Sequence, residues 1–304
     1  MLRELFIGLS SNRALRAFAE HSPLGQKVSR RFVAGTTLDD LLAAAEAVNA
    51  KGMTVSVDNL GENVTNAQEA EASAQLYHQL LDLITKRGLK ANVSLKLTHM
   101  GLDVDPLLAE KLVCGLVDHA RRLDNFVRVD MEGSPYTDRT LDFVHELHRH
   151  YPGHTGAVLQ SYMRRSPADA QKLTAAGIRI RLCKGAYKEP PEIAYQKKSE
   201  VDASYLRLMK MLLTSGIYHG IATHDERIIR QTMRFAEQEN IARDAFEFQM
   251  LHGIRRDLQE RIVREGWRMR VYIPFGSEWY PYLMRRLAER PANVFFIAKN
   301  ILRG

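Results

Sequence analysis

Residues 53–97, MTVSVDNLGENVTNAQEAEASAQLYHQLLDLITKRGLKANVSLKL, contain the pattern that decides the fold. The two ends, MTVSVD and ANVSLKL, are short runs rich in β-branched and apolar residues, which predict buried strands. The segment between them has the apolar spacing of an amphipathic helix, with Gly88 placed where that helix would stop. One strand, helix, strand unit is therefore predicted, and such units build parallel sheets.

The same unit recurs along the chain. The eight candidate strands are MTVSVD from Met53, ANVSLKL from Ala91, FVRVDM from Phe126, GAVLQSY from Gly156, IRIRLCK from Ile178, GIYHGIAT from Gly216, AFEFQML from Ala245 and RMRVYIP from Arg268. Strand and helix alternating in this way predict an α/β fold of the (β/α)₈ barrel (TIM-type) class, with a doubly wound open sheet as the alternative. No G-x-G-x-x-G follows the first strand, which weakens the open-sheet alternative.

The domain boundary is expected near residue 35. There the sequence TTLDD, residues 36–40, has the composition of a capped helix start. We expect a short helical arm in residues 1–35 and the barrel domain in residues 36–304.

Composition and charge limit the classes of partner. The chain has 304 residues, 45% of them hydrophobic, which is enough to bury a full core. The net charge is +7, but the basic segments are separated by acidic ones along the chain. The sequence also has no RNP-type strand, Cys/His finger or long basic tail. No nucleic-acid partner is therefore expected. The N-terminus lacks the apolar stretch of a signal peptide, and we expect a cytoplasmic location.

The first 32 residues combine basic and apolar side chains. Such a segment could lie on an anionic membrane surface, at the inner face of the cell membrane. The alternative is a short helical extension that packs on the domain. Both interpretations stay open at the level of the sequence.

Polar residues gather where the predicted strands end. In a (β/α)₈ barrel the active site lies at the carboxyl ends of the strands, so these residues are the candidates for function. They are Glu62, Lys96, His99, Asp130, Glu132, Gln160, Tyr162, Arg181, Lys184, Tyr187, Thr223, His224, Asp225, Gln249, His252 and Tyr272. Cations are prominent among them, which suits an anionic ligand.

Three other interpretations of this set remain open. Asp130, Glu132, His224, Asp225 and His252 are metal-ligand types, but H-x-H and H-E-x-x-H are absent, so no metal is expected. Lys96 or Lys184 could form a Schiff base, as in an aldolase. A non-enzymatic anion-binding module is the third interpretation.

The segment VYIPFGSEWYPYLMRR, residues 271–286, predicts a final helix that begins between Ser277 and Pro281. Helical spacing puts Tyr282, Arg285, Arg286 and Glu289 on one face, and Leu283, Met284 and Leu287 on another that could dock on the core. Two neighbouring arginines on one face are either a solvated stripe or part of an anion site.

Seven strings together resemble the FAD-dependent proline dehydrogenases, in their short, monofunctional bacterial form. The strings are VSLKLTHMGLD, VRVDMEGS, VLQSYMRR, IRLCKGAYKEP, IATHDE, EFQMLHGI and VYIPFGSEWYPYLMRRLAERPAN. The resemblance implies oxidation of L-proline to 1-pyrroline-5-carboxylate, the first step of proline catabolism to glutamate, by hydride transfer from C5 of proline to N5 of non-covalent FAD. The aldehyde-dehydrogenase half of the bifunctional relatives is missing, so a separate pyrroline-5-carboxylate dehydrogenase would take the product.

The resemblance also implies roles for matching residues. Arg285, Arg286 and Lys96 would hold the proline carboxylate, while Tyr187, Tyr272 and Tyr282 would wall the ring, with Tyr272 disfavouring hydroxyproline. Arg181 would donate near flavin N5, and Asp130 would orient Lys96 or Arg181. The other flavin contacts would be Met131, Gln160, Lys184, Gly185, Ala186, Thr223 and His224. Glu62 would form a gate with an arginine of the final helix, Arg285, and the electrons would pass to a membrane quinone.

Overall fold

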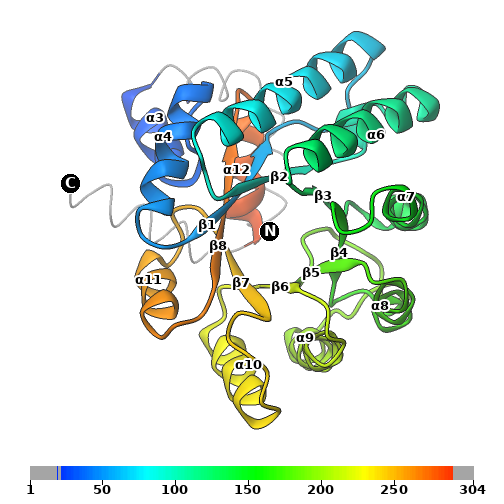
Figure 1. Ribbon diagram of the computed structural model, residues 1–304, viewed down its shortest axis with the longest axis vertical. Helices are drawn as coiled ribbons and strands as arrows, with labels where there is room; N and C mark the ends of the chain where they lie inside the picture. The colour runs from blue at the N-terminus through cyan, green and yellow to red at the C-terminus, as the bar shows by residue number, and fades with distance from the viewer. Residues whose placement is uncertain (1–18, 20–21, 290–304) are drawn as a thin grey trace.

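The computed structural model describes residues 19 and 22–289, and within them the strands form one closed parallel barrel in the order β1 to β8 (Figure 1). The strands are β1 (Thr54–Asn59), β2 (Ala91–Leu95), β3 (Val127–Val129), β4 (Thr155–Gln160), β5 (Arg179–Cys183), β6 (His219–Ala222), β7 (Phe246–Leu251) and β8 (Met269–Phe275). Each predicted strand is present, and the pairing of β1 with β8 closes the sheet. The (β/α)₈ barrel prediction is confirmed.

Helices surround the barrel and cover one of its ends. They are α3 (Pro23–Phe32), α4 (Leu38–Asn49), α5 (Ala67–Lys86), α6 (Pro106–Arg122), α7 (Thr137–His150), α8 (Ser166–Ala175), α9 (Lys198–Leu213), α10 (Glu226–Gln238), α11 (Arg256–Arg264) and α12 (Trp279–Glu289), with short 3₁₀ turns η1 (Thr98–Met100) and η2 (Ser134–Tyr136). Helices α5 to α11 each connect one strand to the next around the outside (Figure 1).

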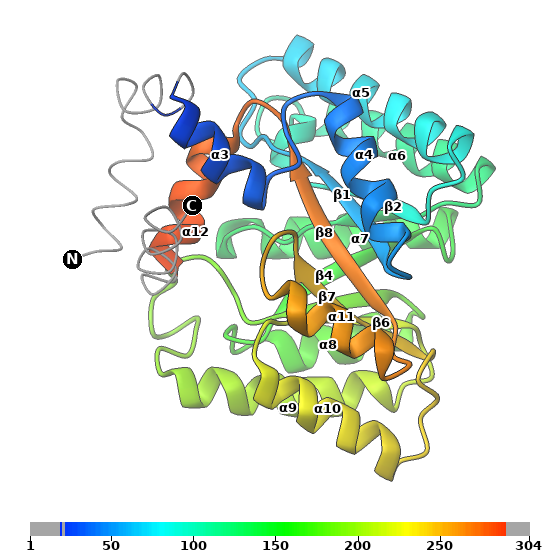
Figure 2. The same ribbon diagram turned by 90° about the vertical axis from the view of Figure 1, so that its left-hand side faces the viewer.

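Helix α4 precedes β1 and packs outside β1 and β8. That is the position which the helix after β8 takes in a regular barrel of this class. Helix α12, which does follow β8, instead packs on α3, and the two lie over the end of the barrel to which β8 runs (Figure 2). The carboxyl ends of the strands therefore face α12 and α3.

Local sequence signals set the helix boundaries. Thr37 caps α4, because its hydroxyl accepts from the amide of Asp40 at 3.2 Å, as the TTLDD pattern predicted. Helix α12 begins at Trp279 and keeps Pro281 within its first turn, inside the predicted window. Two apolar residues of this helix, Leu283 and Tyr282, are both buried in a cluster with Val33. Tyr282, which was predicted to share a face with Arg285 and Arg286, is therefore buried and is not part of a solvent-exposed polar stripe.

The apolar core lies mainly between the strands and the outer helices. Tyr77, Leu80 and Leu81 on α5 are fully buried there, as are Val57 and Val93 on the strands that they cover. The inside of the barrel is instead rich in polar and charged side chains. Buried among them are Ser56, Asn92, Ser94, Arg128, Asp130, Arg181, Glu247 and Gln249. Such groups are costly to bury unless they pair with one another, and their pairing defines the candidate site.

None of the helices in the described residues is both long and apolar enough to cross a membrane. Cys114 and Cys183 are not joined in a disulfide, and both are half-buried.

Candidate active site

Arg181 on β5 is the centre of the buried polar cluster. Its Nη1 donates to Asp130 Oδ1 at 2.6 Å, and its Nε donates to Gln249 Oε1 at 2.6 Å. Its Nη2 donates to the hydroxyls of Ser94 at 2.9 Å and Ser56 at 3.1 Å. The guanidinium is thus held by side chains from three other strands and by Asp130, which directly follows β3, and Arg181 is 6% exposed. Contacts on this scale fix both its position and its plane.

Tyr272 on β8 completes the cluster around Asp130. Its hydroxyl donates to Asp130 Oδ2 at 2.8 Å, and the Arg181 guanidinium lies 5.1 Å from the centre of its ring. Burial raises the pKa of Tyr272 well above its usual range, and the charges of Asp130 and Asp58 raise it further. Tyr272 is therefore a neutral hydrogen-bond donor, and both oxygens of Asp130 have partners.

Lys96, which follows β2, pairs with Asp58 of β1. Its Nζ lies 3.3 Å from Asp58 Oδ2, and Asp58 is only 2% exposed. Burial disfavours the charged lysine, but the carboxylates of Asp58, Asp130 and Glu62 outweigh that effect and raise the pKa of Lys96. A Schiff-base lysine needs a lowered pKa, so the charged state of Lys96 argues against the aldolase interpretation.

The segment that carries Glu62 rests on the turn after β2. The amide of Asn63 donates to Thr98 Oγ1 and the amide of Val64 to Thr98 O, each at 3.4 Å. Thr98 Oγ1 in turn donates to Glu132 at 2.7 Å. Glu62 itself is half-buried, and its charge is among those that act on Lys96.

Lys184, after β5, points toward helices α9 and α10. Its Nζ donates to Asp202 at 2.6 Å and to Asp225 at 2.9 Å. Asp225 also caps α10, and burial, which would raise its pKa, is outweighed by Lys184, so that the pKa falls to about 2. Each predicted cation whose side chain the structure describes therefore has a carboxylate partner. The side chains of Arg285 and Arg286 on α12 lie outside the described part of the structure.

Gly185 and Ala186 lie against the end of β4. Gly185 has φ of +124°, and an added Cβ would come within 2.4 Å of the Tyr162 ring, so only glycine suits this position. The amide of Ala186 donates to Gln160 Oε1 at 3.3 Å, and Gln160 Nε2 donates to Glu132 O at 3.0 Å. Met131 directly precedes Glu132 in the sequence and is 8% exposed.

Two further predicted contacts follow β6. Thr223 Oγ1 accepts from the amide of Asp225 at 3.1 Å. His224 Nε2 accepts from the amide of Leu251 at 2.9 Å, which leaves the imidazole proton on Nδ1 when His224 is neutral.

The three tyrosines predicted to wall the substrate ring lie on different elements of the barrel. Tyr272 lies in the Arg181 cluster, and Tyr282 is buried on α12 near Leu60, just after β1. Tyr187 is half-buried after β5, with its ring 3.9 Å from where a Cβ on Gly133 would lie. The segment that carries Tyr187 contacts the turn η2 after β3, because Glu189 Oε1 accepts from the Ser134 amide at 2.7 Å.

Four residues of the site were not assigned a role from the sequence. Ser56, Asp58 and Ser94 lie inside strands, and Asp202 lies on a helix. Asp58 had a usable signal, because it stands near the end of an apolar run just as Asp130 does. The two serines and Asp202 had none, because their importance comes from neighbours on other strands or helices.

The metal-ligand types are dispersed among other partners. Asp130 pairs with Arg181, Glu132 accepts from Thr98, and Asp225 pairs with Lys184. Within residues 19 and 22–289, no three His, Cys, Asp or Glu side chains form a group that could hold a metal ion. The donor set therefore does not favour the metal-hydrolase interpretation.

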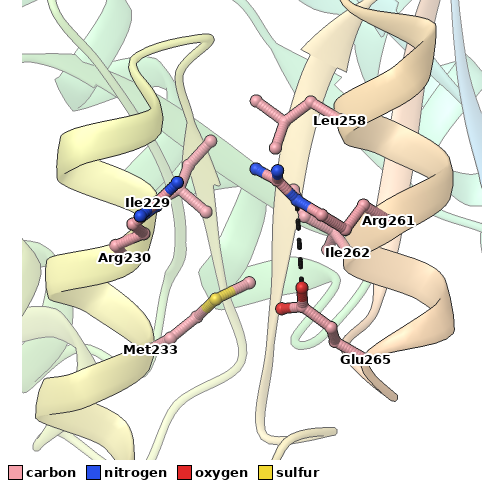
Figure 3. Close-up of a pocket in the computed structure, with 7 residues that line it drawn as sticks. All are labelled: Ile229, Arg230, Met233, Leu258, Arg261, Ile262 and Glu265. Atoms are coloured by element: carbon pink, nitrogen blue, oxygen red, sulfur yellow. Dashed lines mark ion pairs between the residues drawn. The ribbon is translucent and has the colours of Figure 1, made fainter.

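A surface cavity of about 290 Å³ lies between α10 and α11 (Figure 3). It is lined by Ile229, Arg230, Met233, Leu258, Arg261, Ile262 and Glu265. In Figure 3 the Arg261 and Glu265 side chains form an ion pair on one wall, with Nε and Oε1 3.8 Å apart. None of these residues belongs to the polar cluster, so this cavity lies apart from the candidate active site.

The barrel and the cluster of buried cations at its carboxyl end define a (β/α)₈-barrel protein with a candidate site for an anionic ligand. The chain belongs to the proline dehydrogenase family, whose model, described as "Proline dehydrogenase", matches residues 41–299.

Curated relatives match all or nearly all of the chain. The chain is 37% identical over 304 residues to proline dehydrogenase 1 of Bacillus subtilis (strain 168), covering 100% of both chains. It is 38% identical over 281 residues to proline dehydrogenase of Deinococcus radiodurans, covering 91% of each. Family membership and these identities support proline dehydrogenase activity, the first step of proline catabolism.

A solved structure shares the fold. The crystal structure of proline utilization A (PutA) from Bdellovibrio bacteriovorus inactivated by N-propargylglycine superposes with a TM-score of 0.81 at 28% identity. The match covers 86% of this chain but 32% of that one, so this chain spans about a third of the PutA protein.

Two buried histidines, His99 and His219, and the half-buried His252 predict a fall in stability as the pH drops. Burial lowers the pKa of His99 and His252 to about 4 and that of His219 to about 3, from 6.5. Below pH 6.5 the unfolded chain binds more protons than the folded one, so this stability is complete above pH 6.5 and is lost towards pH 4. Each histidine adds a slope of at most about 1.4 kcal/mol per pH unit.

Urea unfolding between pH 7 and 4.5 checks this expectation, because most carboxylates titrate below that window. His252→Asn should reduce the slope, whereas His150→Asn, at a side chain that is 60% exposed, should leave it unchanged. A free energy of unfolding that is constant over the window would contradict the prediction.

Proposed function

We propose that this chain is an FAD-dependent proline dehydrogenase, an L-proline:quinone oxidoreductase that forms 1-pyrroline-5-carboxylate. The observation that carries the proposal is the Arg181, Asp130 and Tyr272 cluster, with the Lys96 and Asp58 pair beside it. These groups lie at the carboxyl end of a barrel whose family oxidises proline. The cofactor, the acceptor and the residue roles below are parts of this proposal.

The donor chemistry of the site fits FAD. Arg181 uses four of its five N–H groups in the contacts above, so one Nη1 N–H has no acceptor among the described residues. Bound FAD would accept, at N5, the hydride from C5 of proline. Residues proposed to hold it are Arg181, Met131, Gln160, Lys184, Gly185, Ala186, Thr223 and His224. The flavin would be bound non-covalently.

The substrate carboxylate needs a paired cation set. We assign it to Arg285, Arg286 and Lys96, because two planar guanidiniums can hold a carboxylate in a fixed orientation. Lys96 is charged and uses one of its three N–H donors on Asp58, so it retains donors for a ligand. Tyr187, Tyr272 and Tyr282 would wall the ring, and Tyr272 favours L-proline over hydroxyproline by crowding one ring face.

The protein's own part in the reaction is alignment and charge. In the neutral amine form of proline, the C5–H bond would break with both electrons leaving as hydride, and the nitrogen would release its one N–H proton, finally to solvent, as the C=N bond forms. Asp130 and Tyr272 hold Arg181 in place, and its positive charge favours the negative charge that develops on the hydride acceptor. Closure of the site would exclude water, with Glu62 pairing Arg285 as a gate.

Reduced cofactor must pass its electrons on. We propose a membrane quinone as acceptor, a peripheral contact through residues 1–32 at the inner face of the cell membrane, and a separate pyrroline-5-carboxylate dehydrogenase for the product. Arg30 and Arg31 in the last turn of α3 are consistent with an anionic surface as partner for this segment.

The absorption spectrum of the purified protein tests the cofactor. We expect flavin bands that bleach when L-proline is added under anaerobic conditions, because the hydride reaches the bound flavin. Heat or acid should release the flavin into the supernatant, since attachment is non-covalent. A colourless protein that still oxidises proline would refute the cofactor assignment.

Substitution of the α12 arginines tests the substrate site. Arg285→Met and Arg286→Met should each raise KM for proline by roughly 30- to 700-fold, because half of a bidentate carboxylate contact is worth about 2 to 4 kcal/mol. The control is Arg149→Met, at an arginine of α7 that is 72% exposed. Normal kinetics in both α12 variants would return these arginines to the solvated-stripe interpretation.

Truncation of the arm tests the membrane contact. Deleting residues 1–18 keeps Ala19 and Phe32, which pack against the α12 cluster. Binding to phosphatidylglycerol vesicles should weaken roughly tenfold or more, because each lost cation near an anionic surface contributes about 1 kcal/mol. Proline oxidation with a soluble dye should be unchanged. Equal vesicle binding by both proteins would show that these residues are not the contact.

A further inference from the structure

A chain of hydrogen bonds connects Arg181 to a second charged layer deeper in the barrel. Gln249 Oε1 accepts from Arg181 Nε at 2.6 Å, and Gln249 Nε2 donates to Glu247 Oε1 at 2.6 Å. An arginine can only donate, and an ionised carboxylate can only accept. The Gln249 amide is therefore held in one orientation from both ends, and it in turn holds Arg181 Nε.

Glu247 is the fixed end of this chain. It is 3% exposed, accepts from Arg270 Nε at 2.6 Å, and accepts from the Tyr218 hydroxyl at 3.0 Å. Burial would raise the pKa of Glu247, but Arg270 outweighs it and the pKa is lowered, so Glu247 is ionised. Arg270 also donates to Val55 O at 2.7 Å, which ties this layer to the backbone of β1.

A glycine leaves room for this arrangement. A Cβ on Gly220 of β6 would lie 2.4 Å from Gln249 Nε2 and 2.8 Å from its amide carbon. Contacts that short are not tolerated, so any other residue at this position would displace the amide. The missing side chain on β6 is filled by the side chain of Gln249 on β7.

A buried ionic network is a costly way to fill the inside of a barrel if its role is only structural. The inside of such barrels is usually packed with branched apolar side chains. Replacing a buried ionic network with apolar groups is often neutral or stabilising. A network of Arg270, Glu247 and Gln249 that ends on the Arg181 Nε therefore points to a role in placing that guanidinium.

We propose that Glu247 and Gln249 are positioning residues that hold Arg181 so that its remaining Nη1 N–H is presented to the flavin. The inference rests on the proposed function, in which Arg181 is the donor to the cofactor. Asp130 and the two serines hold the outer nitrogens, while Gln249 alone among the described residues holds Nε. A guanidinium that loses this contact can rotate, and its charge then stabilises the reduced cofactor less well.

The midpoint potential of FAD in the holoenzyme tests the inference. Gln249→Met removes the contact to Nε, and Gly220→Ala displaces the amide without removing a functional group. Each should shift the balance between reduced and oxidised flavin at least tenfold towards the oxidised form, which is about 30 mV for a two-electron couple. In both variants kcat should fall more than KM rises, because the substrate contacts are intact.

Gly115→Ala on α6 is the matched control, because nothing lies within 4 Å of the Cβ that it adds. Its potential should equal that of the wild type. Urea midpoints check that each variant is folded, so that a change in potential is not a consequence of lost structure.

A double-mutant comparison separates positioning from general damage. Glu247→Gln should lower the potential in the wild type but add little in the Gln249→Met background, since its effect passes through that amide. Wild-type potentials in both Gln249→Met and Gly220→Ala would overturn the inference, even if Glu247→Gln fails to fold. A wild-type protein that binds no flavin would instead overturn the proposed function.

Discussion

The ion pair between Arg181 and Asp130 is the constraint on which the inside of this barrel depends. The buried charge of Arg181, a residue that is 6% exposed, needs partners, and residues of β1, β2 and β7 together with Asp130 after β3 supply them. Once that group is placed, the neighbouring positions are limited to side chains that can accept or donate in register. The polar groups around Arg181 therefore follow from this one buried cation.

Because the inside of the barrel is polar, the apolar contacts that stabilise the fold lie in the outer layer, between the strands and the helices. Tyr77, Leu80 and Leu81 are fully buried there. The two layers meet at the Tyr77 hydroxyl, which donates to Ser94 O at 2.7 Å and accepts from the amide of Asn59 at 3.1 Å. An outer helix thus helps to fix the strand ends that carry Asp58 and Lys96.

Sequence reasoning was strong on the fold and weaker on the partners within the site. The strands could be predicted because β-branched runs such as MTVSVD and helical periodicity are local signals. The choice of partner for a charge is not local: Arg181 finds Gln249 and Ser56 across the barrel, and Lys184 finds Asp202 on the next helix. Asp58 could have been included from its position near a strand end, whereas Gly220 acquires its meaning only from the amide beside it.

Helix α4 has a consequence for how this barrel can change. Because α4 covers β1 and β8 with Leu41, Ala45 and Val48, the apolar layer over the β1–β8 pairing is supplied by the helix before β1 and not by α12. In the proposed function, closure of the barrel wall and recognition of the substrate are then carried by different helices, α4 and α12. Under that proposal, substitutions at Arg285 and Arg286 would change what enters the barrel while the wall at β1 and β8 keeps its cover, whereas Tyr282 and Leu283 are held by the apolar cluster that they share with Val33.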